Sequence, residues 1–295
     1  MPHVISRRSL LAASVFAASV LGTSGASGKS ERQSAAQSKL AALEAGVKGR
    51  LGVAALDVTT GRRIDYRTGE RFAMCSTFKL LLVASVLQAA DRHQDDLGRR
   101  IVFSERDFLS HSPITSLHKG LPGMTIKDLC EAAIAYSDNT AANGLLANFG
   151  GPSALTAWLR AMGDPVTRLD RTEPSLNEAI PGDPRDTTTP SSMLDDARKI
   201  VLGDVLAPPS RTMLTGWLIA DTTGAKRLRA GLPQGWRAGD KTGTSGNGCF
   251  NDVAVIWPPK GGPLIVSAFL AESKADDADS EAVLEEIGKL VAAMA

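Results

Sequence analysis

The chain has few of the residues that build disulfide frameworks and zinc sites: 295 residues include only three cysteines and four histidines. Three scattered cysteines cannot form a disulfide framework, and in an exported protein an odd number leaves at least one thiol free. The histidines lack the i, i+4 pairing with a carboxylate that zinc enzymes show. We therefore expect no metal site.

The sequence also lacks an excess of charge of either sign. It has 33 Lys and Arg residues against 32 Asp and Glu residues, a formal net charge of +1. Because no basic stripe is visible, we expect no nucleic-acid partner. The hydrophobic content of 43% and the charged content of 22% are ordinary for a soluble globular protein with a substantial core.

The apolar stretch near the N-terminus, Leu10 to Leu21, is too short to span a membrane comfortably. It follows the basic pair Arg7 and Arg8 and precedes small residues, which is typical of a secretory signal, and the paired arginines indicate twin-arginine export. A retained N-terminal anchor is the alternative. We predict a signal peptide over residues 1–29 and a periplasmic mature chain that has no membrane anchor.

The hydrophobic periodicity changes type along the mature chain. The pattern predicts a helix over 30–47 and two strands within 51–67. A helical pattern, interrupted by turn-rich stretches, then extends over 76–220. Three strands follow at 236–244, 249–257 and 264–272, and a helix over 280–295 ends the chain. The simplest assembly is an α+β fold: a five-stranded antiparallel sheet flanked by terminal helices, with an all-helical domain inserted and the active site between them. We assign 30–70 and 218–295 to the α/β domain and 71–217 to the helical domain.

The stretch AMCSTFKLLLV contains a serine and a lysine, Ser76 and Lys79, spaced to lie on one face of a helix. The apolar run that follows marks a buried helix, and burial lowers the pKa of an amine, so Lys79 can act as a base that activates the serine hydroxyl. A lysine that snorkels out of a core helix is the equal alternative. A second Ser-x-x-Lys, Ser116 to Lys119, has no apolar run behind it and is expected to be a surface loop.

Two further motifs carry polar groups next to apolar helical segments. Ser137, Asp138 and Asn139 separate two such segments, and alone they are more typical of a helix N-cap. The proline-rich stretch 169–186 is long for a plain connection, which favours a functional loop. Glu173 lies within it, with a surface ion pair as the alternative reading.

The last motif is Lys241, Thr242, Gly243 and Thr244 on a predicted strand. A cation beside two hydroxyl groups and a flexible glycine can clamp a substrate carboxylate. The alternative is an exposed edge strand whose lysine prevents aggregation.

The four motifs Ser-x-x-Lys, Ser-Asp-Asn, Arg-x-Glu-x-x-Leu-Asn and Lys-Thr-Gly occur in this order, and all but the first occur once. With them the chain resembles the class A serine β-lactamases and, more distantly, the penicillin-binding proteins, over essentially the whole mature chain. The resemblance implies a β-lactamase/transpeptidase-like fold and hydrolysis of penicillins and cephalosporins without a metal or cofactor, by a monomer. The alternatives are a penicillin-sensitive D-alanyl-D-alanine peptidase and a non-enzymatic secreted binding protein.

The resemblance also implies roles for the catalytic residues. Ser76 is the nucleophile that opens the β-lactam ring, and Lys79 accepts or relays its proton. Glu173 activates a water, held together with Asn177, that hydrolyses the acyl-enzyme. Ser137 carries a proton to the departing lactam nitrogen. Whether Lys79 or Glu173 starts acylation stays open, since their protons are expected to be coupled.

A second group of residues is implied to bind the substrate: Asn139, Asn177, Lys241, Thr242, Thr244, Arg227 and His111. Asn139 would bind the side-chain amide, and the backbone N–H groups of Ser76 and Thr244 would form the oxyanion hole. Phe250 stands where some members have a carboxylate-binding arginine, and Arg227 matches the arginine that others use instead.

Two structural features complete the set. An ion pair between Arg171 and Asp186 would close the loop that holds Glu173, and the residue after that glutamate, Pro174, matches a cis peptide of the family.

The cysteines depart from the family patterns. The position that would pair with Cys130 holds Val83, and the position that would pair with Cys75 in several carbapenem-hydrolysing members holds Ser245. A link between Cys75 and Cys249 is conceivable, but we expect Cys75 to be a buried free thiol.

Overall fold

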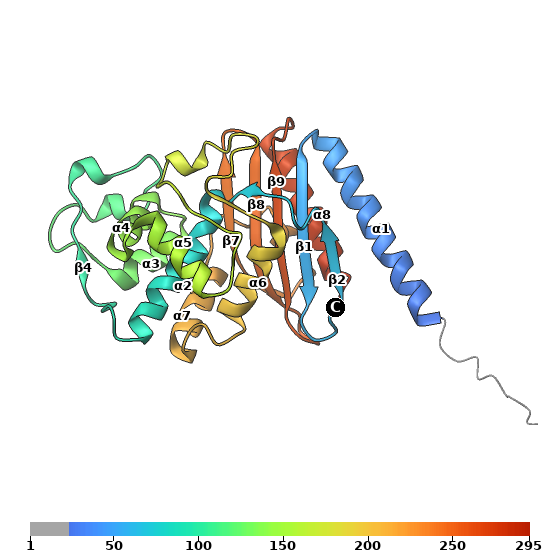
Figure 1. Ribbon diagram of the computed structural model, residues 1–295, viewed down its shortest axis with the longest axis horizontal. Helices are drawn as coiled ribbons and strands as arrows, with labels where there is room; N and C mark the ends of the chain where they lie inside the picture. Colours follow the sequence, from blue (N-terminus) through green and yellow to red (C-terminus); the bar gives the residue numbers. More distant parts are fainter. Residues whose placement is uncertain (1–23) are drawn as a thin grey trace, which may run out of the picture.

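The computed structural model describes residues 24–295, so the predicted signal peptide lies almost entirely outside the described residues. The first described element is helix α1 (Ser24–Val47), which contains the helix expected over 30–47. It runs along one side of the molecule, and the chain also ends on that side (Figure 1).

The centre of the molecule is a five-stranded antiparallel sheet, as the sequence predicted, with the strand order β2-β1-β9-β8-β7. Its strands are β1 (Arg50–Asp57), β2 (Arg63–Tyr66), β7 (Arg237–Ser245), β8 (Cys249–Trp257) and β9 (Leu264–Ala271). β9 is buried along its whole length, which requires that both faces of the sheet be covered. β7 forms one edge.

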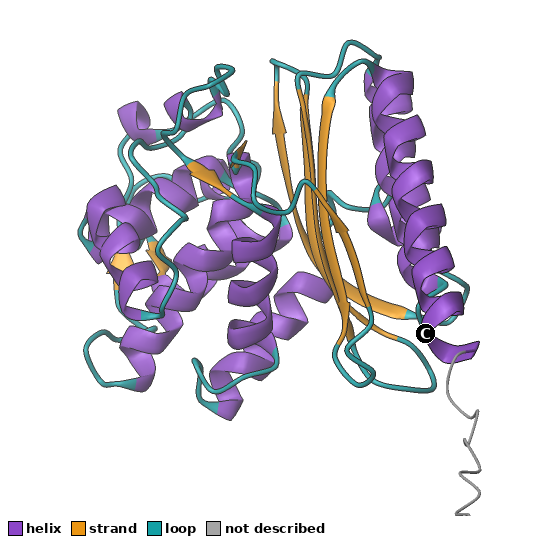
Figure 2. Ribbon diagram, turned by 45° about the vertical axis from the view of Figure 1, so that its right-hand side comes forward, coloured by secondary structure: helices purple, strands orange, loops and turns teal. Residues whose placement is uncertain are grey.

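Helices cover both faces of the sheet (Figure 2). On one face, α1 and the C-terminal α8 (Asp277–Ala292) enclose a core that includes Leu40, Val266 and Leu284. On the other face, a larger core joins the sheet to the remaining helices and includes Phe78, Leu82 and Phe269. The α+β architecture with terminal helices on one side of the sheet is therefore confirmed.

The second group of helices lies between β3 and β7 in the chain: α2 (Phe78–Asp91), α3 (Ile126–Ala135), α4 (Asn139–Phe149), α5 (Gly151–Ala161), α6 (Pro190–Val201) and α7 (Pro208–Ile219). Two small two-stranded sheets are present that the sequence pattern does not predict. They pair β3 (Phe72–Ala73) with β6 (Thr187–Thr188) and β4 (Arg100–Ile101) with β5 (Met124–Thr125).

The domain limits stay a prediction, but the elements suggest one adjustment. The expected boundary between residues 217 and 218 falls inside α7, so a boundary after Ile219 leaves that helix whole.

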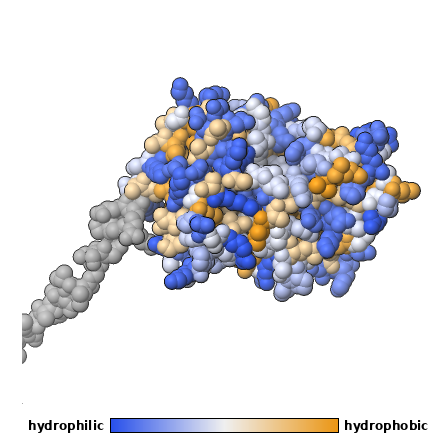
Figure 3. Space-filling model, turned by 180° about the vertical axis from the view of Figure 1, so that it is seen from behind, coloured by the Kyte–Doolittle hydropathy of each residue, from blue (hydrophilic) through white to orange (hydrophobic). Residues whose placement is uncertain are grey.

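The described surface is mixed in polarity. Figure 3 shows hydrophilic and hydrophobic residues interspersed over the face seen from behind. No helix in residues 24–295 has both the length and the apolar character needed to cross a bilayer.

Candidate active site

Ser76 and Lys79 lie where a 3₁₀ turn leads into α2, and this turn packs against the edge strand β7. The helix begins slightly later than expected: a 3₁₀ turn, η1 (Cys75–Thr77), carries Ser76 and leads into α2 at Phe78. Lys79 is completely buried, so the snorkelling alternative is wrong. Ser76 is partly exposed, so a substrate can reach its hydroxyl group.

The Lys79 ammonium is held by three acceptors from distant segments. Its Nζ lies 2.6 Å from Asn139 Oδ1, 2.7 Å from the carbonyl oxygen of Ser137 and 3.2 Å from Glu173 Oε1. Burial lowers the pKa of Lys79 to about 8, an effect that the charge of Glu173 opposes and that of Lys241 reinforces. The amine can therefore exchange a proton near neutral pH.

The Ser-Asp-Asn motif is both a helix N-cap and a source of polar groups for the site. Asp138 is the N-cap of α4, where its carboxylate accepts the backbone N–H of Ala141. The residues on either side of it face the site: Ser137 Oγ lies 3.4 Å from Lys79 Nζ, and the amide oxygen of Asn139 accepts from the same ammonium group. Ser137 has a left-handed backbone with φ of 54°, a conformation that costs energy in a non-glycine residue.

Glu173 is buried, with 3% of its surface exposed, which excludes the surface ion-pair reading. Its Oε1 accepts a hydrogen bond from Ser76 Oγ at 3.3 Å, and its Oε2 accepts one from Asn177 Nδ2 at 2.5 Å. Asn177 belongs to the 3₁₀ turn η4 (Ser175–Asn177), which begins two residues after Glu173. This short turn therefore brings the Asn177 amide back to the Glu173 carboxylate.

Asn143 is a site residue that the sequence analysis missed. Its side-chain oxygen accepts the N–H of Glu173 at 3.0 Å, and its amide donates to the carbonyl oxygen of Glu173 at 2.8 Å. α4 thus fixes the backbone of the loop at the residue that carries the carboxylate. Its position one turn into α4, after Asn139, is the only signal that the sequence offers.

The segment 169–186, hereafter the Ω-loop, is closed at its base. Arg171 Nε lies 2.6 Å from Asp186 Oδ2, and Asp186 Oδ1 also accepts the backbone N–H groups of Asp170 and Arg171. The structure thus contains the ion pair that the resemblance implies, and the Glu173–Pro174 peptide bond is cis, as expected. The following strand β6 then pairs with β3, which directly precedes η1, the 3₁₀ turn that carries Ser76.

Lys241 is completely buried although β7 is an edge strand, so the anti-aggregation reading is wrong. Burial lowers its pKa, while the carboxylates of Asp221, Asp240 and Asp252 act in the opposite direction. Gly243 is needed because a Cβ at this position would lie only 2.6 Å from the carbonyl oxygen of Met74. The backbone of β7 can therefore pack directly against η1, the turn that carries Ser76.

The hydroxyl groups beside Gly243 differ in their surroundings. Thr242 is buried, and its Oγ1 lies 2.5 Å from Thr223 Oγ1. Thr244 is exposed, and its Oγ1 accepts a hydrogen bond from Arg227 Nη2 at 2.7 Å. The guanidinium of Arg227 also lies over the ring of Phe250, with 5.5 Å between its Cζ and the ring centroid.

His111 lies at the exposed rim of the site. Its carbonyl oxygen accepts the N–H of Asn139 at 2.8 Å, and its Nε2 lies 3.2 Å from the carbonyl oxygen of Tyr136. The structure therefore places His111 next to the Ser-Asp-Asn turn, where the resemblance expects a residue at the mouth of the cleft. The second Ser-x-x-Lys, from Ser116 to Lys119, is exposed as predicted, although Ser116 lies in the short 3₁₀ turn Thr115–Leu117 and only the residues after this turn are in a loop.

The comparisons with known proteins agree with this geometry. The model of the Beta-lactamase enzyme family matches residues 35–294. Beta-lactamase L2 of Stenotrophomonas maltophilia is 47% identical over 270 residues, which cover 91% of this chain and 89% of that protein. Beta-lactamase CTX-M-8 of Citrobacter amalonaticus is 46% identical over 255 residues, covering 86% and 87% respectively.

A solved structure described as an ancestral (GNCA) class A beta-lactamase matches with a TM-score of 0.86 and 57% identity, covering 88% of this chain and all of that one. Family model, relatives and structure agree over the segments that carry all four motifs. The chain belongs to the class A serine β-lactamase family.

Proposed function

We propose that the protein hydrolyses the β-lactam amide of penicillins and cephalosporins through an acyl-enzyme on Ser76, and thereby confers antibiotic resistance. The observation that carries this is the buried Lys79–Glu173 pair, in which Glu173 also contacts the Ser76 hydroxyl. A serine hydroxyl becomes a competent nucleophile when a neighbouring base takes its proton. Here the Glu173 carboxylate is hydrogen-bonded to that hydroxyl, and Lys79 is ion-paired with the carboxylate.

Deacylation is assigned to Glu173. Its Oε2 is held by Asn177, whose own Oδ1 is buried and has no hydrogen-bond partner among the described residues. A carboxylate beside a free amide oxygen can position a water molecule and remove its proton. A peptidase that stays acylated by penicillin needs no such carboxylate, so Glu173 favours the hydrolase over the peptidase.

Ser137 is assigned the proton transfer to the departing lactam nitrogen, because its hydroxyl lies beside the Lys79 ammonium. Lys241, Thr242, Thr244 and Arg227 are assigned to the substrate carboxylate, which needs a cationic, hydrogen-bonding clamp. The N–H groups of Ser76 and Thr244 would bind the developing oxyanion, supported by the direct packing of β7 on the nucleophile turn.

We also propose that the mature protein acts in the periplasm as a monomer, exported by the twin-arginine route. The support for export is the basic pair Arg7 and Arg8 ahead of the apolar stretch, together with the small residues that follow. The monomeric state is proposed from the resemblance alone.

Incubation with nitrocefin or benzylpenicillin, followed by intact-mass measurement, tests the assignment. We expect turnover by the wild type and a stable acyl adduct on Ser76 in Glu173→Gln. Glu105→Gln, which changes an exposed glutamate, is the matched control and should turn over normally. A stably acylated wild type would indicate the peptidase, and a wild type with neither turnover nor adduct would indicate the non-enzymatic binding protein.

A further inference from the structure

Two of the three cysteines lie in contact directly behind the nucleophile. Cys75 immediately precedes Ser76 in η1, and Cys249 opens β8, where the hairpin places it opposite Ser245 of β7. Both residues are buried and both are free thiols, and each side chain is the largest influence on the pKa of the other. Asn251 holds the two segments together, because its amide donates to the carbonyl oxygens of Ala73 and Met74.

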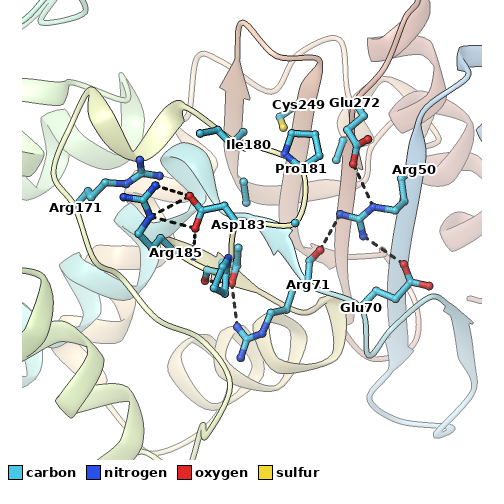
Figure 4. A pocket seen from close by; sticks show the side chains of 16 residues that line it. Arg50, Glu70, Arg71, Arg171, Ile180, Pro181, Asp183, Arg185, Cys249 and Glu272 are labelled. Atoms are coloured by element: carbon cyan, nitrogen blue, oxygen red, sulfur yellow. Dashed lines mark hydrogen bonds and ion pairs between the residues drawn. The ribbon is translucent and has the colours of Figure 1, made fainter.

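Cys249 also lines a cavity of about 400 Å³ that lies between the far half of the Ω-loop and the ends of the central strands. Figure 4 shows its sulfur next to Ile180 and Pro181, with Arg50 and Glu272 on the other side. Cys75 is not part of the lining. One thiol of the pair therefore faces a space of the size that binds small molecules, and the other lies behind it.

The interaction between the two thiols shifts their pKa values in opposite directions. The hydrogen bond from Cys75 lowers the pKa of Cys249 to about 7, against the effect of burial. The same contact, together with burial, raises the pKa of Cys75. The thiolate is the nucleophilic form of cysteine, so the reactive member is the one that faces the cavity. Cys130 is buried in the helical core, and burial raises its pKa.

We propose that Cys249 and Cys75 form a thiol–disulfide exchange site for low-molecular-weight disulfides that enter through this cavity. The Cys249 thiolate attacks one sulfur of the small disulfide, forms a mixed disulfide and releases one small thiolate, which takes a proton from water. Cys75 then loses its proton to water and attacks the Cys249 sulfur, which releases the second small thiolate. Two protein thiols are oxidised to one disulfide, and the small disulfide is reduced to two thiols.

The second step is favoured by the first. In the mixed disulfide Cys249 is no longer a thiolate, so the interaction with its side chain that is the largest cause of the raised pKa of Cys75 is lost, and with it the smaller effect of its charge. The product ties the residue before Ser76 covalently to β8, in a place where Asn251 otherwise makes the connection. This site does not depend on the β-lactam chemistry proposed above, because its product is measured on the protein alone.

Oxidised glutathione is a suitable probe. The folded wild-type protein is incubated with it, then denatured and alkylated with N-ethylmaleimide, and the modified residues are located by peptide mass mapping. We expect Cys75 and Cys249 to be recovered as one disulfide and Cys130 to be alkylated. Retention of three alkylated cysteines, or modification of Cys130 in place of Cys249, would overturn the proposal.

Three variants define the order of the steps. Cys75→Ser should stop at a glutathione adduct on Cys249, because the resolving thiol is absent. Cys249→Ser should leave Cys75 unmodified, since Cys75 does not line the cavity. Cys130→Ser is the matched control for removal of a buried thiol and should behave like the wild type. An adduct on Cys75 in the Cys249→Ser protein would contradict the proposed entry through the cavity, and the wild-type mapping decides the question even if a variant fails to fold.

Discussion

The Lys79 ammonium and the Glu173 carboxylate lie 3.2 Å apart, and neither side chain is exposed to solvent. Removing two charges from water is costly, and their mutual attraction offsets that cost only while both remain charged. A proton that leaves Lys79 therefore changes the environment of Glu173, and the reverse also holds. The two candidate bases for acylation are thus physically coupled in this chain.

This coupling predicts how the Glu173→Gln variant responds to pH. The Glu173 charge raises the pKa of Lys79, so its removal should bring that pKa below about 8 and leave the amine neutral at lower pH. The acylation rate of the variant should then rise with pH to a plateau whose midpoint lies below 8. Rapid-mixing measurements of acylation by benzylpenicillin between pH 5 and 9 test this. Slow acylation at every pH, without a midpoint, would show that Glu173 and not Lys79 is the acylation base.

Asn143→Ala should impair deacylation although the residue carries no chemistry. Loss of its two hydrogen bonds to the Glu173 backbone should lower the free energy of unfolding by about 2 kcal/mol, at roughly 1 kcal/mol for each bond. It should also slow hydrolysis of the acyl-enzyme more than its formation. Asn148→Ala, which removes exposed hydrogen bonds with Arg99 and Asp95 at the end of the same helix, is the control and should leave the deacylation rate unchanged. Deacylation at the wild-type rate in Asn143→Ala would exclude the positioning role.

The contrast between Asn143 and Lys79 shows what the sequence could predict. The sheet and the terminal helices follow from period-two and period-3.6 patterns, and the four motifs identify residues that the fold brings together. Asn143 belongs to no motif, and its two partners are backbone groups 30 residues away, which no local pattern reveals. The local sequence also does not decide whether Lys79 and Lys241 are buried, because their burial depends on the segments that pack over them.

The Ser-Asp-Asn turn illustrates a different limit. Local propensity predicted an N-cap, and Asp138 is one, yet Ser137 and Asn139 point to Lys79. A cap and a site are not exclusive, because adjacent side chains can serve both purposes. The contact between Cys75 and Cys249 depends on the register of the β7–β8 hairpin, which turn length sets and composition does not reveal.

The ion pair at the base of the Ω-loop should matter far more than the ion pairs on its surface. Arg171→Ala leaves the Asp186 carboxylate, 1% exposed, without its cation, which should cost about 2–4 kcal/mol of unfolding free energy and slow deacylation. Arg185→Ala removes an exposed partner of Asp183 in the same loop and should leave the Tm nearly unchanged. Thermal unfolding and acyl-enzyme lifetimes measure both effects. Equal losses in the two variants would refute the special role of the buried pair.

Away from the active site, α6 contains a carboxyl group that should limit stability at alkaline pH. Asp196 is buried, no donor among the described residues reaches either of its oxygens, and its neighbour is the Asp164 carboxyl group. Burial, reinforced by the Asp164 charge, raises the pKa of Asp196 to about 9. A proton shared between the two carboxyl groups gives them a hydrogen bond to each other and removes one of the two negative charges, as in other buried carboxyl pairs.

Asp196→Asn should therefore stabilise the protein in a pH-dependent way. The unfolded chain releases this proton near pH 4 and the folded chain only near pH 9, so the contribution of the group to stability falls as the pH rises between those values. The asparagine amide donates to Asp164 without titrating, so the gain should be on the order of 2–4 kcal/mol at pH 8 and should shrink toward zero at pH 4. Asp195→Asn, at the adjacent and partly exposed position, is the control and should change the Tm little at either pH. Thermal unfolding of the three proteins across this range measures the difference, and an Asp196→Asn protein that is less stable than the wild type at pH 8 would show that the carboxyl group is ionised in the folded state.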